Sequence, residues 1–88
     1  MPAADAETVS RVRRVLTEHA RMPVAVEGLD ENADLYQAGM TSHASVTVML
    51  ALEDAFDVEF PDSMLTRETF ASIGAMAAAV TQLRPPSP

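Results

Sequence analysis

The sequence predicts an all-α fold, a bundle of three longer helices and one short helix with a long loop between the first two long helices. Three observations predict it. Apolar residues recur at intervals of three and four, no segment reads as a strand, and serine or threonine precedes several apolar runs. The 88 residues, with a hydrophobic content of 48%, suffice for one thin core. We therefore expect a single folded domain over residues 1–84.

The first helix is expected from about Ala6 to about Ala20, with Asp5 as its cap. Its arginines fall mostly on the face opposite to one apolar stripe. The stripe consists of Val9, Val12, Val15 and Leu16. Pro23 should prevent the helix from extending much further.

A long loop is expected from about Met22 to Thr41. Loops of this length are uncommon in small domains and are often functional. We expect its apolar residues to pack it onto the helices, and these are Val24, Val26, Leu29, Leu35 and Tyr36.

The second helix is expected to begin at Thr41 or Ser42, with Thr41 as a plausible cap, and to end near Asp57. It is apolar around most of its circumference. Such a helix is either buried on several sides or shows part of its apolar surface to a partner. Residues Val58 to Pro61 read as an extended connector, because the residue before a proline avoids helical angles.

Two further helices complete the expected bundle. Thr66 can cap a short helix that runs to about Phe70, and Ser72 can cap the last helix, near whose end Arg84 is electrostatically favourable. The inner face of the last helix is expected to consist of Ile73, Met76, Ala77 and Val80. Residues 85–88, which include three prolines, should stop this helix and form a disordered tail.

Charge and composition exclude several classes of function. The net charge of −7 argues against nucleic acid as a partner, and no basic residue stands between Arg21 and Arg67. The resulting negative field favours encounter with basic partner surfaces, although acidic surfaces also simply keep proteins in solution. Cysteine is absent, which excludes disulfides and thiolate sites, so any thiol must come from a cofactor.

No apolar run is long enough to span a membrane. Residues Met1 to Glu7 carry no basic region followed by an apolar block, so no signal peptide is expected. The sequence thus predicts a cytoplasmic protein, which we expect to be a monomer.

Metal binding is not favoured by the sequence. Asp30 to Asp34 carries the alternating oxygen ligands of a calcium loop, but Leu35 and Thr41 occupy the positions that need glycine and bidentate glutamate. The two histidines, His19 and His43, lie on different expected helices without a second ligand at metal spacing.

A hydrolytic serine is not favoured either. His43 directly follows Ser42, so on a helix its side chain points elsewhere and cannot act as the base of that serine. The three glycines are far apart, and no phosphate-binding loop is present.

Ser42 is the residue with the clearest functional interpretation. Gly39 allows a tight turn into the second helix, and Ser42 then presents its hydroxyl at the positive end of the helix dipole. A phosphodiester at that position is favoured by the dipole and by free backbone amides. By this pattern alone, a serine at a helix start is more often only a cap.

The segment from Asp34 to Pro61 resembles the acyl carrier protein family, which includes peptidyl and aminoacyl carrier domains. The residues that carry the resemblance are Asp34-Leu35, Gly39-Met40, Ser42, Leu52-Glu53 and Phe56, with Phe60-Pro61 and Ser72-Ile73 also in the expected places. It extends over about residues 9 to 83, nearly the whole chain.

The resemblance implies that a phosphopantetheinyl transferase moves the 4'-phosphopantetheine arm of coenzyme A onto Ser42. The thiol of the arm then carries a carboxylic acid as a thioester from a loading enzyme to a downstream acceptor, and the protein itself catalyses nothing. Thr41 stands where the family usually has aspartate, and His43 where it usually has a hydrophobic residue. The next turns lack the acids typical of fatty-acid carriers, which argues against bulk fatty-acid synthesis.

The runs Gly39 to Val46 and Glu53 to Pro61 are more similar to a bacterial subgroup of stand-alone aminoacyl carriers. Ligases similar to the catalytic core of seryl-tRNA synthetases load these with small amino acids. The alternatives are an acyl carrier for polyketide or specialised-lipid synthesis and, from another class, a small acidic interaction module without a prosthetic group. The candidates for partner contact are Thr41, His43, Ala44, Thr47, Leu50, Glu53 and Asp54.

Overall fold

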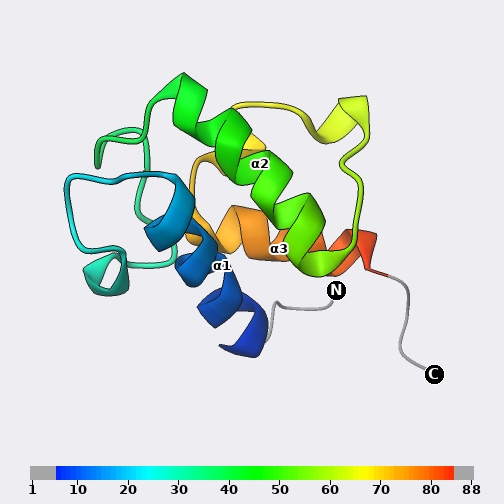
Figure 1. Ribbon diagram of the computed structural model, residues 1–88, viewed down its shortest axis with the longest axis horizontal. Helices are drawn as coiled ribbons and strands as arrows, with labels where there is room; N and C mark the ends of the chain where they lie inside the picture. The colour runs from blue at the N-terminus through cyan, green and yellow to red at the C-terminus, as the bar shows by residue number, and fades with distance from the viewer. Residues whose placement is uncertain (1–5, 85–88) are drawn as a thin grey trace.

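The computed structural model describes residues 6–84 (Figure 1). It contains three α-helices, α1 (Ala6–His19), α2 (Ser42–Phe56) and α3 (Ile73–Leu83). Three single-turn 3₁₀ helices lie in the connections, and these are η1 (Val26–Gly28), η2 (Asp62–Met64) and η3 (Glu68–Phe70). Residues 6–84 form no strand, so the all-α class is confirmed for this part of the chain.

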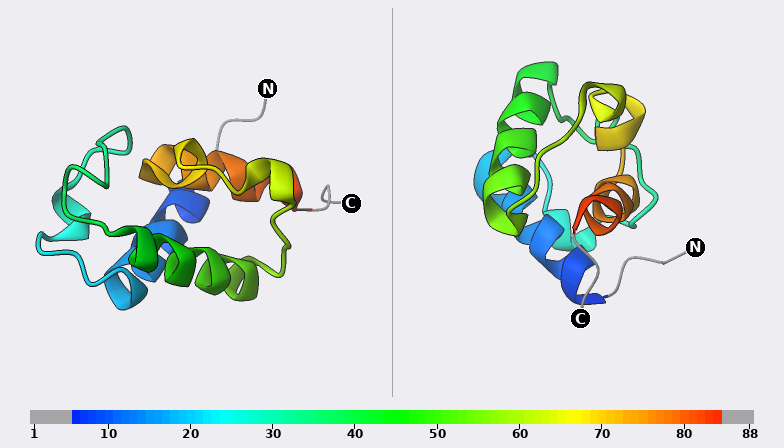
Figure 2. Two further views of the ribbon diagram at one scale, coloured as in Figure 1. Left: turned by 90° about the horizontal axis from the view of Figure 1, so that it is seen from above. Right: turned by 90° about the vertical axis from the view of Figure 1, so that its right-hand side faces the viewer.

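Helix α1 packs against both other long helices. Figure 2 shows α2 on one side of the molecule and α3 with η3 on the other. The inner faces expected for the first and last helices are confirmed, since these residues are all buried: Val9, Val12, Val15, Leu16, Ile73, Met76, Ala77 and Val80. Burial of each larger apolar side chain stabilises the fold by about 1.5–3 kcal/mol.

Helix α2 buries one face and shows apolar residues on another. Its buried residues, Val48, Leu52 and Phe56, are spaced by four and form one stripe. By contrast, Val46 and Leu50 are 52% and 56% exposed. Of the two expectations for this helix, the second therefore applies, because part of its apolar surface faces solvent.

The loop between α1 and α2 is fixed by polar contacts as well as by burial. The guanidinium of Arg13 donates to the carbonyl oxygens of Val26 at 2.9 Å and Leu29 at 2.8 Å. Arg13 is half-buried, whereas Arg14 beside it is exposed. The expected packing of Val24 was wrong, because its side chain is 45% exposed.

The expected short helix from Thr66 to Phe70 is present only as the single turn η3. Thr66 Oγ1 does accept a hydrogen bond from Thr69 N at 3.3 Å. The chain then reaches Ser72, whose extended backbone (φ −147°) and side-chain bond to Ala75 N begin α3. Five residues between two caps leave no room for a longer helix.

The end of α1 and the position of Arg84 at the end of α3 agree with the expectations from the sequence. Helix α1 ends at His19, and Arg21 follows with a left-handed φ of 51°. Arg84 lies at the end of α3, where its N–H donates to Val80 O at 3.0 Å. Asp5 and the tail 85–88 lie outside the described residues. Within residues 6–84, every helix is too short or too polar to cross a membrane.

Candidate functional site

Gly39 sets the path of the chain into α2. Its φ is 115°, which L-residues rarely adopt, and a Cβ at this position would lie 2.5 Å from Cγ of Pro23. Behind it, Met40 is buried and its N–H donates to Leu35 O at 2.9 Å. Backbone angle and packing therefore both require glycine at this turn.

The turn before Gly39 is shaped by Asp34. One oxygen of its carboxylate accepts from Tyr36 N at 2.9 Å and from Gln37 N at 3.3 Å, as in an Asx turn. Leu35, which directly follows Asp34, is fully buried, and its N–H donates to Ala71 O at 2.7 Å. These bonds attach the turn to the segment before α3 and hold the start of α2 in place.

Ser42 is the first residue of α2 and is exposed. Thr41 caps the helix as expected, because its Oγ1 accepts from Ala44 N at 3.0 Å. The first backbone bond of the helix runs from Ser45 N to Thr41 O at 3.0 Å. The amides of Ser42 and His43 are left over by these bonds, so they are free to face an anion at the positive end of the helix.

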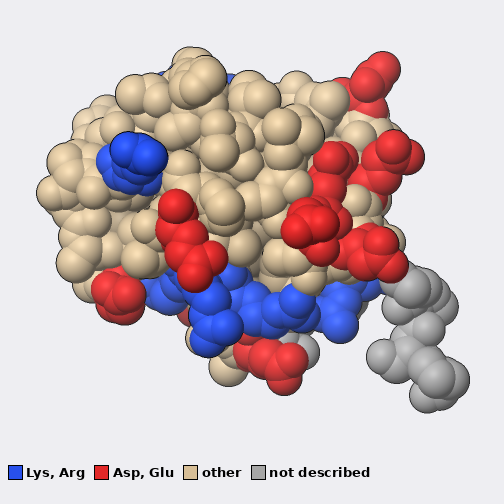
Figure 3. Space-filling model, viewed as in Figure 1, with Lys and Arg blue, Asp and Glu red and all other residues tan. Residues whose placement is uncertain are grey.

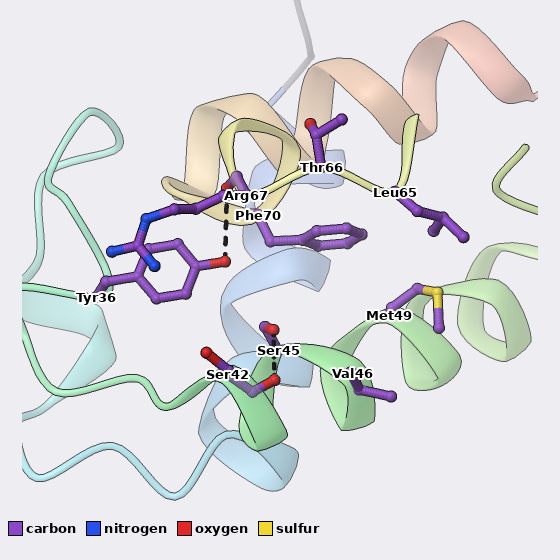
Figure 4. A pocket seen from close by; sticks show the side chains of 9 residues that line it. All are labelled: Tyr36, Ser42, Ser45, Val46, Met49, Leu65, Thr66, Arg67 and Phe70. Carbon is purple, nitrogen blue, oxygen red and sulfur yellow. Dashed lines mark hydrogen bonds between the residues drawn. The ribbon is translucent and has the colours of Figure 1, made fainter. Parts of the chain in front are cut away.

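A cavity of ≈ 340 Å³ opens beside Ser42, between α2 and the segment that leads into η3 (Figure 4). At one end of the cavity Figure 4 shows Ser42, Tyr36 and Arg67. At its other end lie the apolar side chains of Val46, Met49 and Leu65. The serine therefore lies at the polar end of a largely apolar cavity.

Tyr36 and Arg67 form a pair at this end of the cavity. The guanidinium carbon of Arg67 lies 3.9 Å from the centroid of the Tyr36 ring. The hydroxyl of Tyr36 donates to the carbonyl oxygen of Arg67 at 3.5 Å, across 31 residues of sequence. Sequence reasoning missed this pair, and its one available signal was that Arg67 ends the long stretch without basic residues.

Charge is unevenly distributed around the site. Figure 3 shows acidic residues gathered over the C-terminal end of α2 and basic residues along the edge formed by α1. From Ser42 to Leu52, α2 carries no acidic or basic side chain apart from His43. Acids follow as Glu53, Asp54, Asp57, Glu59 and Asp62. The face of α2 next to Ser42 consequently carries no formal charge, and the acids of this helix begin about three turns further along.

Among residues 6–84, no group of three or more His, Asp or Glu side chains is placed to hold a metal ion. His19 lies at the end of α1, and His43 lies in the first turn of α2.

Comparison with known proteins identifies the family of the chain. Residues 10–80 match the family described as the phosphopantetheine attachment site. The chain belongs to this family. Its relatives include the aminoacyl carrier protein of Agrobacterium fabrum, 46% identical over 69 residues, which are 78% of this chain and 83% of the relative. Aminoacyl carrier protein 1 of Bradyrhizobium diazoefficiens is 29% identical over 97% of this chain and 96% of its own.

Solved structures of related carriers share the fold. A carrier protein from Agrobacterium tumefaciens has been solved with an engineered Bradyrhizobium japonicum glycine:[carrier protein] ligase and AMP. It is 44% identical to this chain with a TM-score of 0.81, over 83% of this chain and 97% of its own. The corresponding complex with ATP gives 42% identity and a TM-score of 0.83, over 86% and 99%.

The residues of the site fit a phosphopantetheine group. The group is joined through a phosphodiester, which needs an accessible hydroxyl and favours nearby N–H donors. Ser42 offers an exposed hydroxyl with the two leftover amides of the first turn. Ser45 also lines the cavity, but its hydroxyl donates to Ser42 O at 2.7 Å. The start of α2 therefore offers the hydroxyl and the N–H donors that the attachment of phosphopantetheine needs.

The expected partner-contact residues are spread along α2. Thr41 and His43 are exposed beside Ser42, and Ala44 and Thr47 are half-buried. The others are Leu50 and Asp54, which are exposed, and Glu53, which is half-buried. Val46 lies on α2 among these residues with 52% of its surface exposed, and it was not one of the expected contact residues.

Proposed function

We propose that this chain is a carrier protein that bears phosphopantetheine on Ser42 and carries an amino acid as a thioester between enzymes. The observation that supports it most strongly is the position of Ser42, exposed at the start of α2 behind the fixed turn at Gly39, inside the matched family segment. The identity of 46% to an aminoacyl carrier protein supports an amino acid as cargo.

In the attachment step, the Oγ of Ser42 attacks the phosphorus of coenzyme A that bears the pantetheine. An O–P bond forms, the pyrophosphate link breaks, and adenosine 3',5'-bisphosphate leaves. The hydroxyl proton goes to a base of the phosphopantetheinyl transferase, since among residues 6–84 Ser42 has no basic side chain hydrogen-bonded to it. The amides of Ser42 and His43 and the dipole of α2 then stabilise the phosphodiester.

In the loading step, an amino acid:carrier protein ligase activates an amino acid with ATP, and pyrophosphate leaves. The arm, when attached to Ser42, would supply the thiol that takes the activated aminoacyl group as a thioester, with AMP and the thiol proton released. The ligase-bound structures of a 44%-identical carrier support a partner of this class. A downstream enzyme then accepts the aminoacyl group. The protein provides attachment and delivery and does no chemistry of its own, and tethering raises the local concentration of the cargo.

We place these reactions in the cytoplasm, where ATP and coenzyme A are available, and propose that the carrier acts as a monomer. A second cargo class, an acyl chain, is favoured by one observation, the apolar end of the cavity beside Ser42. A long chain could be partly buried there, whereas a charged aminoacyl group would lose its hydration.

The attachment is tested by intact-protein mass spectrometry after incubation with coenzyme A and a broad-specificity phosphopantetheinyl transferase. We expect a mass gain of one phosphopantetheine in the wild type and in Ser45→Ala, and none in Ser42→Ala. Ser45→Ala is a matched control because Ser45 lines the same cavity one turn further along α2. A folded wild type that gains no mass, while a known carrier is modified in parallel, would leave the acidic interaction module as the better interpretation.

A further inference from the structure

The cavity beside Ser42 contains an unusual charge. Among the described residues that line it, Arg67 is the one with a formal charge, and no acidic side chain joins it there. No lysine or arginine stands between Arg21 and Arg67 in the sequence, and the surrounding segment is rich in acids. A cation held in this place, next to a serine, is unexplained by the packing of the core.

Arg67 is held in an orientation that leaves its donors available. Its guanidinium carbon lies over the ring of Tyr36, 3.9 Å from the ring centroid, and the Tyr36 hydroxyl donates to the carbonyl oxygen of Arg67 at 3.5 Å. Stacking occupies the face of a guanidinium and leaves the N–H groups along its edge free to bind an anion. Within residues 6–84, those N–H groups donate no hydrogen bond to the protein.

We propose that Arg67, oriented by Tyr36, is a positioning residue for the phosphodiester of the phosphopantetheine arm. Ser42 and Arg67 line the same end of the cavity (Figure 4), so a phosphate on Ser42 Oγ lies between the first-turn amides of α2 and this guanidinium. Arginine binds phosphate oxygens through paired N–H groups. This inference rests on the proposed attachment of the arm to Ser42.

The position of the phosphate has a consequence for the cargo. An aminoacyl thioester carries an ammonium group at the far end of the arm, and the apolar end of the cavity fails to solvate that charge. The guanidinium thus retains the phosphate end of the arm, while the loaded end stays in solvent, where the next enzyme can reach it.

The test compares apo and phosphopantetheinylated protein for wild type and Arg67→Gln. We expect the arm to raise the Tm of the wild type by about 2–4 °C, because a new ion contact forms at the surface. In Arg67→Gln this gain in Tm should fall by about half or more, to the part that the first-turn amides and the dipole of α2 supply. The ³¹P NMR signal of the phosphodiester should also move in Arg67→Gln, and the Arg67 Nε–H signal should move in the wild type when the arm is attached.

Arg14→Gln is the matched control, because Arg14 is an exposed arginine on α1 that does not line this cavity. It should keep the full wild-type gain. Tyr36→Leu should lose most of the gain although Arg67 is still present, and Tyr36→Phe should keep most of it. If Arg67→Gln and wild type show the same gain and the same ³¹P shift, the inference is wrong.

Mass spectrometry of each sample separates the two proposals. Failure of Ser42 to be modified in every protein would refute the attachment itself. Complete modification without any effect of Arg67→Gln would refute the role of Arg67 and leave the attachment intact.

Discussion

The carboxylate of Glu53 accepts a hydrogen bond from the backbone of Phe60, with 2.9 Å between Glu53 Oε2 and Phe60 N. Phe60 is 5% exposed, and its ring lies edge-on to that of Phe70 at 5.4 Å between centroids. Glu53, a candidate for partner contact, therefore also fixes the connector after α2 and the aromatic pair beneath it.

We expect Glu53→Ala to lower the free energy of unfolding by about 1–3 kcal/mol, because it leaves the part-buried N–H of Phe60 without its charged acceptor. Urea unfolding measures this. Asp54→Ala is the matched control, since Asp54 is the exposed neighbour and should change stability by less than about 0.5 kcal/mol. Equal effects of both substitutions would show that the Glu53 bond contributes nothing specific.

Replacement of Gly39 by alanine is expected to destabilise the fold by about 2–4 kcal/mol, because a Cβ would strain the backbone and collide with Pro23. The matched control is Gly28→Ala, where an added Cβ would meet no atom of residues 6–84 outside its own helical turn within 4 Å, so the change should be small. Thermal unfolding compares the two, and a neutral Gly39→Ala would refute the strained turn.

Thr41→Ala is expected to lower the free energy of unfolding by about 1 kcal/mol, because Ala44 N loses the side-chain acceptor that caps α2. Thr41→Asp should retain wild-type stability, since aspartate caps equally well and its charge favours the helix start. Chemical denaturation of the apo protein measures both variants. Loss of stability in Thr41→Asp as large as in Thr41→Ala would contradict the capping role.

The exposed apolar residues of α2 should act in partner binding. We expect Val46→Asp to lower kcat/KM of the loading ligase about tenfold or more, while the stability changes by less than about 0.5 kcal/mol. Val24→Asp is the control, because Val24 is a similarly exposed valine that lies in the loop between α1 and α2. A ligase that treats both variants alike would place its contact surface elsewhere.

Cargo should affect thermal stability according to its polarity. A glycyl thioester should change the Tm of the arm-bearing protein by less than about 1 °C, because its ammonium avoids the apolar end of the cavity. An octanoyl thioester should raise the Tm by several degrees if its chain enters that end. N-acetylglycyl is the control without the positive charge. A glycyl group that raises the Tm as much as octanoyl would contradict the solvent-exposed cargo.

Sequence periodicity was sufficient for most of the fold. The stripes of α1 and α3 were predicted correctly, because apolar spacing reports burial directly in amphipathic helices. Thr41 and Ser72 were also predicted as caps. The length of the short helix before Ser72 was overestimated, because a cap and a favourable composition do not reveal how few residues remain before the next cap.

The contacts that sequence could not predict join residues far apart in the chain. Helical periodicity gave Arg13 no particular partner, yet it binds carbonyls of the loop that folds back over α1. The pair of Tyr36 and Arg67 likewise depends on how the loop and the η3 segment meet. Ser42 was proposed as the attachment residue through the family resemblance, since a serine at a helix start is by itself an ordinary cap.

The most direct measurement of the central claim is a charging assay with the phosphopantetheinylated protein, an amino acid:carrier protein ligase, ATP and labelled amino acids. We expect one small amino acid to label the wild type and Ser45→Ala, with the label released by neutral hydroxylamine as a thioester requires. Apo protein and Ser42→Ala should stay unlabelled. Label on Ser42→Ala would contradict the account. So would the absence of label on the arm-bearing wild type when a related carrier is loaded with amino acid in parallel.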